Sequence, residues 1–93
     1  MLFVSLFTPK PTHTMAESMK RRTEWKVPQG IKPIAEYWLQ TNSPRLIAIF
    51  EADNIAPIME ANRAWSDLFD INVVPAVTAE EGLKLASQMM PKT

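Results

Sequence analysis

Two stretches in the middle of the chain, Ile31 to Gln40 (IKPIAEYWLQ) and Arg45 to Asp53 (RLIAIFEAD), decide the fold. Each has the composition of a β-strand, and the residues between them, Thr41 to Pro44, are typical of a tight turn. The two stretches therefore predict a β-hairpin. Leu46 to Phe50 is a continuous apolar run, which is typical of a strand covered on both faces and predicts a place in the middle of a sheet.

Segments on both sides of the hairpin complete a regular order of elements. The sequence predicts strands at Leu2 to Thr8 and Ile71 to Val77, and helices that begin at Thr14, at Asp53 or Asn54, and at Thr78. The order is strand, helix, strand, strand, helix, strand and a closing helix, which is the ferredoxin-like βαββαβ arrangement with one added helix. We therefore expect an α+β fold with a four-stranded antiparallel sheet, in a single domain over residues 1–93.

Two prolines support this topology. Pro33 and Pro75 fall in the second and fourth strands, which the arrangement places at the edges of the sheet. Proline lacks the backbone N–H that a central strand needs, and an edge strand tolerates its absence. The first and third predicted strands contain no proline, as central strands require.

The predicted helices carry start signals and apolar inner sides. Thr14 to Glu17 and Thr78 to Glu81 each match a capping box, in which the Thr hydroxyl and the Glu carboxylate bind free backbone N–H groups. Helical spacing then defines the side of each helix that faces the core. These sides comprise Met15, Met19, Arg22 and Lys26 in the first helix, Ile55, Ile58, Met59, Asn62, Trp65 and Phe69 in the second, and Leu83, Ala86 and Met90 in the third.

Composition narrows the classes of function. Ten basic residues balance ten acidic ones, so no field attracts nucleic acid and little repulsion keeps two copies apart. The apolar start, Met1 to Phe7, is shorter than a membrane span and has no basic leader, so it is read as the first strand. The lack of cysteine removes disulfides, thiolate metal sites and cysteine nucleophiles. We expect a cytoplasmic protein without nucleic-acid or membrane partners.

Apolar residues occupy both faces of the first and third predicted strands. In this topology the helices cover one face of the sheet and leave the other face bare. Four strands then expose more apolar surface than the few hundred Å² that monomers usually tolerate. We expect a homodimer in which two bare faces meet around a two-fold axis, with a cavity between each sheet and its first two helices. The alternative is a monomer whose last helix folds back over the bare face.

Three stretches carry a resemblance to a known family: Ile49 to Asn54, Ala64 to Phe69, and Val73 to Thr78 with Glu80 after it. Through them the chain resembles a small bacterial and archaeal family known only as domain of unknown function 3303. That family looks like a member of the dimeric α+β-barrel superfamily, so the resemblance implies this fold and a dimer. Superfamily members are as unlike as cofactor-free quinol monooxygenases, haem-degrading enzymes, lactone isomerases and effector-sensing domains. The fold does not choose among them.

His13 is the only histidine and lies between the first strand and the first helix, near the expected mouth of the cavity. Imidazole is the side chain best suited to proton transfer near neutral pH, so His13 is the candidate for a general base or an axial ligand. The alternative is a histidine exposed in a loop. A metal site with several protein ligands is not expected, because the chain has no second histidine and no cysteine.

Four further residues are candidates for ligand binding in the cavity: Arg22, Tyr37, Asn62 and Trp65. Arg22 lies on the inner side of its helix and would bring a cation to an anionic ligand, whereas Lys20 and Arg21 belong to a solvated, ion-paired face. Asn62 lies on an apolar side and needs a hydrogen-bond partner, either the backbone or a ligand. Trp65 has the spacing of a residue that packs against the sheet.

Several carboxylates lie near the ends of predicted elements. Asp67 lies near the expected C-terminal end of the second helix, where the helix dipole disfavours a negative charge. We expect an ion pair with Arg63, and the alternative is that Asp67 is kept for a partner. Glu51 and Asp53 alternate to one face of the third strand, and Glu36 lies in the neighbouring strand. Paired carboxylates can divide acid and base work, but a capping or rim role is the stronger interpretation here.

Two functions from different classes follow. The first is a small-molecule binding domain, or a cofactor-free enzyme, whose cavity holds a small apolar or aromatic anion. The second is a non-catalytic dimerisation or metabolite-sensing module whose interior is filled. Whether the protein is an enzyme stays open, and no cofactor is expected. A cavity of a few hundred Å³ with converging polar groups distinguishes the first function from the second.

Overall fold

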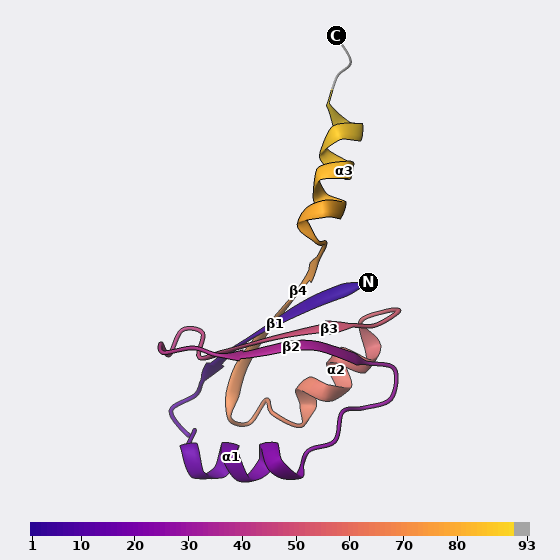
Figure 1. The fold of residues 1–93 in the computed structure, drawn as a ribbon. Helices are drawn as coiled ribbons and strands as arrows, with labels where there is room; N and C mark the ends of the chain where they lie inside the picture. Colours follow the sequence, from indigo (N-terminus) through magenta and orange to yellow (C-terminus); the bar gives the residue numbers. More distant parts are fainter. Residues whose placement is uncertain (91–93) are drawn as a thin grey trace.

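The computed structural model describes residues 1–90, and its elements follow the predicted order. The elements are β1 (Leu2–Pro9), α1 (Met15–Glu24), β2 (Lys32–Trp38), β3 (Leu46–Glu51), α2 (Ala56–Arg63), β4 (Phe69–Ala76) and α3 (Ala79–Met89). Figure 1 shows α1 and α2 on one side of a single sheet, with α3 projecting from the other side. The predicted ferredoxin-like α+β fold with a C-terminal helix is confirmed.

The sheet is antiparallel throughout, in the order β2-β3-β1-β4. β1 and β3 are therefore the central strands, and β2 and β4 are the edges. Pro33 and Pro75 both lie in edge strands, as predicted. Phe3 of β1 lies opposite Phe50 of β3 and opposite Pro75 of β4, so these three side chains share one face of the sheet.

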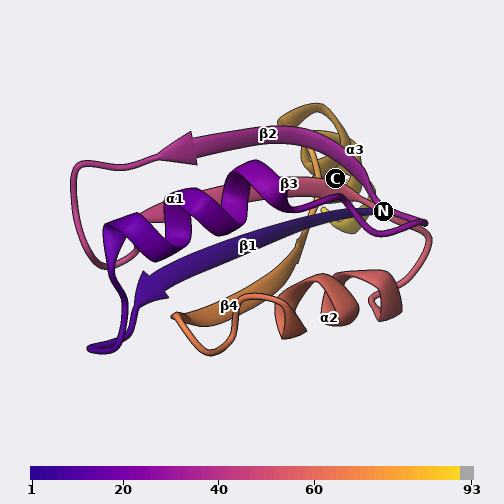
Figure 2. The same ribbon diagram turned by 90° about the horizontal axis from the view of Figure 1, so that it is seen from below.

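That face carries the core, because alternate residues of each strand point toward the helices. In β1, Phe3, Ser5 and Phe7 are buried, while the intervening residues are only partly covered. Figure 2, seen from the helical side, shows α1 across the central strands and α2 toward the β4 side. The buried cluster consists of Phe3, Phe7, Ala48, Phe50, Ala52, Ile58, Trp65, Leu68 and Phe69.

The second helix is shorter than its apolar spacing predicted. α2 ends at Arg63, so Trp65 lies in a turn, and Phe69 opens β4 two residues before the predicted start at Ile71. The reason is local: the Trp65 N–H donates to the Asn62 carbonyl at 3.0 Å, an i to i+3 bond that tightens the chain and ends the helix. Trp65 and Phe69 are still buried, because the turns deliver them to the same core.

Of the two hydrogen bonds that define each predicted capping box, the structure confirms the one made by the Thr hydroxyl. Thr14 Oγ1 accepts from the Glu17 N–H at 3.2 Å, and Thr78 Oγ1 accepts from the Glu81 N–H at 3.1 Å. The Glu17 carboxylate does not return a bond to the helix start. It accepts instead from Arg21 Nη2 at 3.1 Å, one turn further along α1.

The start of α2 uses one of the two predicted capping residues. Asn54 Oδ1 accepts from the Ala56 N–H at 2.9 Å, so Asn54 rather than Asp53 satisfies a free donor at this end. Pro57 lies in the first turn of α2, where its missing N–H leaves no hydrogen bond unmade.

The prediction that α3 faces inward is wrong. α3 extends away from the sheet, and none of its residues is buried (Figure 1). Leu83 and Met90, two of the three residues predicted to point inward, are 72% and 68% exposed, and Ala86 is exposed as well. The helix continues the direction in which β4 leaves the sheet, so it does not fold back over the bare face. No helix within residues 1–90 has the length and apolar character needed to cross a bilayer.

The sheet face opposite α1 and α2 is therefore uncovered, and we call it the open face. Strand register places nine apolar side chains on it. They are Leu2, Val4 and Leu6 of β1, Ala35 and Tyr37 of β2, Ile47 and Ile49 of β3, and Val74 and Ala76 of β4. The expectation that the central strands are apolar on both faces is confirmed, and one of these faces has no cover from residues 1–90.

Candidate functional site

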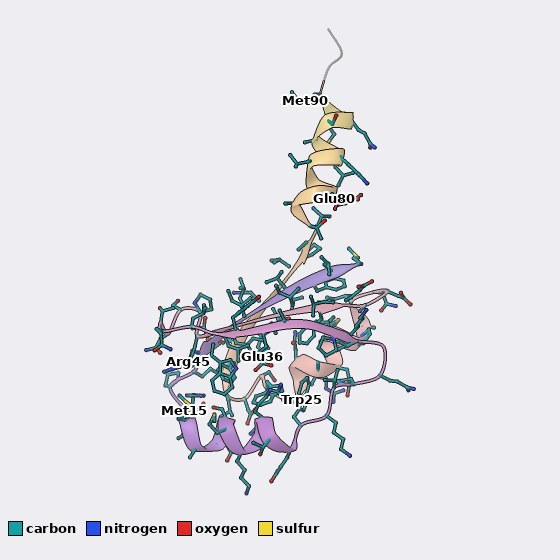
Figure 3. The ribbon with its side chains drawn as sticks, in the orientation of Figure 1. Met15, Trp25, Glu36, Arg45, Glu80 and Met90 are labelled. Carbon is teal, nitrogen blue, oxygen red and sulfur yellow. The ribbon has the colours of Figure 1, made fainter. Side chains whose placement is uncertain are left out.

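A cavity of about 490 Å³ lies between the sheet and α1. Its walls come from α1, from β2 and β3, from the connection between those two strands, and from the segment 61–69. Figure 3 shows Arg45 and Met15 at one end of this space, Glu36 below the middle of the sheet, and Trp25 toward the other end of α1.

Aromatic side chains form much of the wall. All three tryptophans of the chain, Trp25, Trp38 and Trp65, line the cavity. Trp25 and Trp65 meet edge to face, with ring centroids 6.0 Å apart. Phe69 lies 6.2 Å from Trp65 and 5.6 Å from Phe7, so the aromatic surface continues to the floor of the cavity. The walls therefore suit an apolar or aromatic ligand.

The inner side of α1 is apolar but not packed. Met15 and Met19 line the cavity, yet they are 50% and 42% exposed because the empty space separates them from the sheet. Ser18, between them on the same side, is the only buried residue of α1. The sequence predicted this side of the helix correctly at Met15, Met19 and Arg22, but Lys26 does not reach the cavity.

One side of α1 is held by Arg21. Its two terminal nitrogens donate to both carboxylate oxygens of Asp67, at 2.6 and 3.0 Å. Nη1 also donates to the Ala64 carbonyl at 2.8 Å, and the guanidinium lies 5.7 Å from the Trp65 ring. These hydrogen bonds hold the pKa of the Asp67 carboxyl below its ordinary value of 3.8, and they raise the pKa of Arg21.

The predicted ion pair between Asp67 and Arg63 is wrong. Arg63 binds Glu60, three residues earlier on α2, at 3.2 Å. Because α2 ends at Arg63, Asp67 lies beyond the helix and points toward α1 instead. Arg21 was assigned to a solvated face of α1, and the structure makes it the tie between α1 and the segment after α2.

The other side of α1 is held by Arg22, whose Nη2 lies 3.1 Å from Glu36 Oε1 of β2. Glu36 also accepts from Trp38 Nε1 at 2.6 Å. Arg22 lines the cavity, as predicted, but its charge already has a carboxylate partner. A ligand that used Arg22 would first have to displace Glu36.

His13 lies on the cavity wall rather than free in a loop. Its ring packs 5.0 Å from Phe69, and Nε2 lies 2.7 Å from the Ser18 hydroxyl. The Ser18 hydroxyl donates to the Thr14 carbonyl at 3.2 Å, so His13 and the first turn of α1 share one hydrogen-bond network. These contacts fix the orientation of the His13 ring at the cavity wall.

The remaining predicted residues divide between the two faces of the sheet. Asn62 and Trp65 line the cavity with His13 and Arg22. Tyr37 does not: it is paired with Ile47 on the open face and is 57% exposed. The structure therefore brings four of the five candidates together and places the fifth on the opposite surface.

The three strand carboxylates do not form a pair for acid and base work. Glu36 lies opposite Ala48, whereas Glu51 lies at the far end of β3, opposite Lys32. Asp53 lies beyond β3 and has no hydrogen bond or ion pair among residues 1–90. No cluster of three or more His, Cys, Asp or Glu residues in the described chain is arranged to hold a metal ion.

Arg45 lines the cavity but was not among the predicted site residues. It precedes β3 and lines the cavity at the end near the start of α1. Its Nε is buried and has no hydrogen-bond partner among residues 1–90. The sequence did contain a signal for Arg45. It is a cation directly before the apolar run Leu46 to Phe50, and a residue next to a central strand can carry its side chain into the interior.

A family model described as Domain of unknown function (DUF3303) matches residues 1–90. No curated protein and no solved structure matches the chain. The matched range includes every cavity residue described above.

Proposed function

Since the chain belongs to the family described as Domain of unknown function (DUF3303), whose description names no activity, we propose from the geometry that it is a homodimeric domain that binds a small apolar or aromatic anion. The observation that carries the proposal is the cavity between the sheet and α1, with aromatic walls and converging polar groups. A cytoplasmic location belongs to the same proposal, because a chain without cysteine is compatible with a reducing compartment.

The size and lining of the cavity support binding of a small molecule. A volume of about 490 Å³ falls within the roughly 300 to 1,000 Å³ of typical ligand sites. Such sites combine apolar walls with a few polar groups that orient the ligand, and here His13, Arg22 and Asn62 supply them. The half-exposed sides of Met15 and Met19 gain apolar contacts when the space is filled.

The open face supports the homodimer. Nine apolar side chains on one sheet surface have no cover from residues 1–90, and a second copy offers an identical surface that matches it around a two-fold axis. The formal net charge of zero gives two copies no reason to repel.

The orientation of α3 adds to this argument. α3 projects from the side of the sheet that carries the open face, with Leu83, Leu85 and Met89 exposed. A second copy docked on the open face would give the apolar residues of this helix a surface to pack against. The α3 helix of each subunit would then pack against the sheet of the other subunit.

A thermal-shift screen tests the ligand. The protein is heated with haem, quinones, flavins and small carboxylates, alongside His13→Ala. We expect at least one compound to raise the midpoint, and less so in the variant. If no compound raises the midpoint and His13→Ala matches the parent throughout, the protein is the alternative, a dimerisation module without a ligand.

A matched pair of variants locates the binding. Met19→Trp fills the cavity from the inner side of α1, whereas Lys20→Trp places the same ring on the outer side. The first should abolish the thermal shift, and the second should leave it intact. Equal shifts in both variants would place the ligand elsewhere.

Light scattering tests the dimer. At micromolar concentration we expect a mass of twice the 10.6 kDa of one chain. Val74→Lys introduces a charge on the open face, in the edge strand β4, and should give a monomer, whereas Met59→Lys on α2 should not. The apolar spacing placed Met59 on the inner side of this helix, but the structure leaves it 59% exposed. A native mass of 10.6 kDa would refute the dimer and leave the cavity proposal standing.

A further inference from the structure

Arg45 differs from the other arginines of the chain. Arg21, Arg22 and Arg63 each bind at least one carboxylate within 3.2 Å. Within residues 1–90, Arg45 has no carboxylate within ion-pair distance, and its Nε–H is buried without an acceptor. A buried donor without a partner destabilises the native state.

Arg45 lies where two hollows meet. A shallower hollow adjoins the cavity at this end, and Arg45, His13, Met15 and Asn42 line both spaces. Lys10 also lines the hollow, but its Nζ lies 3.9 Å from a carboxylate oxygen of Asp70. Arg45 is therefore the cation at this end of the cavity that has no carboxylate partner among residues 1–90.

We propose that Arg45 is the anion-binding residue of the cavity and that its ligand is a monocarboxylic acid with an aromatic or aliphatic body. This inference rests on the proposed function, which it makes specific. The carboxylate lies at the guanidinium of Arg45, and the body of the acid extends between α1 and the sheet toward the tryptophans. The side of a guanidinium that carries Nε–H and one Nη–H presents two parallel donors, which match the two oxygens of a carboxylate.

Charge balance selects this class of ligand. Arg22 is neutralised by Glu36, so Arg45 is the cavity cation that lacks a counter-charge among the described residues. One unbalanced guanidinium compensates one negative charge. A phosphate ester, with nearly two, would bring excess charge next to apolar walls and the Glu36 carboxylate.

The experiment compares acids with their neutral amides by titration calorimetry on the full chain. The probes are phenylacetate and 4-phenylbutyrate, 2-phenylacetamide and 4-phenylbutanamide, and inorganic phosphate. We expect each acid to bind at least about tenfold more tightly than its amide, the ratio that loss of a charged hydrogen bond predicts. In Arg45→Gln the acid affinity should fall to that of the amide, whose own affinity should not change.

Three variants make the result specific. Arg45→Lys keeps the positive charge but removes the two parallel N–H donors of the guanidinium, so it should retain only part of the preference for acid over amide. Arg63→Gln removes an arginine outside the cavity and should leave the titrations unchanged. Arg22→Gln combined with Glu36→Gln removes the other cavity cation together with its counter-ion. Circular dichroism and the unfolding midpoint of each variant show that the fold is kept.

The outcomes separate this inference from the proposed function. The role of Arg45 is overturned if the native protein binds acid and amide equally. It is also overturned if the preference for acid is lost in the double variant of Arg22 and Glu36 but kept in Arg45→Gln. Both results leave the proposed ligand binding intact. Binding of inorganic phosphate as tight as that of the acids overturns the carboxylate class. If no acid and no amide binds at millimolar concentration, both the inference and the proposed binding function are wrong.

Discussion

Ser5 is a polar residue in an apolar position. It lies in the middle of β1, between Ala48 and Val73, on the sheet face that carries the core. It is fully buried, and its hydroxyl has no hydrogen-bond partner in the part of the chain that the structure describes. A buried hydroxyl without a hydrogen-bond partner destabilises the native state, because it has lost its hydrogen bonds to water.

We therefore expect Ser5→Ala to leave the free energy of unfolding unchanged or to raise it by up to about 1 kcal/mol. Ser18→Ala is the matched control. The Ser18 hydroxyl is bound to His13 and to the Thr14 carbonyl, so its loss should lower the free energy of unfolding by about 1 kcal/mol. Urea unfolding measures both, and a clear loss of stability in Ser5→Ala would show that its hydroxyl has a partner in solution.

The contact between Arg21 and Asp67 predicts a dependence of stability on pH. Arg21 lowers the pKa of Asp67 in the folded protein, so folding favours the ionised carboxyl. The resulting stabilisation is present above the ordinary value of 3.8 and is lost as the pH falls through the lower folded value. Asp67→Asn should be less stable than the parent at neutral pH, and the difference should vanish in acid.

Urea unfolding from about pH 6 to about pH 2 tests this expectation. Asp53→Asn is the control, because Asp53 is exposed and binds no cation of the described chain. A difference between Asp67→Asn and the parent that stayed constant over the whole range would contradict the linkage.

Single residues were predictable where their environment is local. His13, Arg22, Asn62 and Trp65 were placed at the cavity from helical spacing and from their position next to predicted elements. The partner of Asp67 was not predictable, because Arg21 is 46 residues away in the sequence and α2 ends too early for Arg63 to compete. Long-range pairs depend on packing that spacing along one element does not reveal.

α1 and α2 use the same sheet face differently. α2 packs directly on it, with Ile58 fully buried in the core cluster. α1 stands over the cavity and is tied at its two sides by polar groups, Arg21 to Asp67 and Arg22 to Glu36. α2 therefore contributes mainly to stability, and α1 forms a wall of the site.

This division predicts the effect of truncating α2. Ile58→Ala should lower the free energy of unfolding by about 2 to 5 kcal/mol, because it removes buried contacts and leaves a cavity. Met59→Ala, the next residue and an exposed one, should change it by less than about 0.5 kcal/mol. Chemical denaturation measures both, and similar values for the two variants would contradict the packing of α2.

The order of the elements was predictable because each carries its own signal: the apolar run of β3, the edge prolines and the Thr caps of α1 and α3. The end of α2 was not, because Trp65 and Phe69 keep helical spacing while the chain has already turned. Periodicity reports which residues are buried more reliably than which element buries them.

At the scale of the whole molecule, the chain measures 58 by 29 by 17 Å because α3 projects from the body. The open face was predictable from alternation along β1 and β3. The direction of α3 was not, because an apolar stripe requires a cover and does not say whether the cover belongs to the same chain. We interpret both surfaces as parts of one interface between two copies.

Removal of α3 tests that interpretation. A chain that ends at Val77 should keep its sheet, α1 and α2, because α3 contributes no buried residue to them. The dissociation constant of its dimer should be at least about tenfold higher than that of the native chain. Sedimentation equilibrium measures both constants. The control keeps α3 but replaces Lys84 and Gln88 by alanine. An unchanged dissociation constant after truncation would exclude α3 from the interface.

The prolines at the sheet edges also bear on what happens when the protein is concentrated. Both outer strands are interrupted, β2 by Pro33 and β4 by Pro75, so neither offers the unbroken row of donors that an incoming strand would copy. Growth of the sheet from molecule to molecule into amyloid-like fibres is hindered at both ends. At high concentration, chains therefore associate through the open face of the sheet and not through its edge strands.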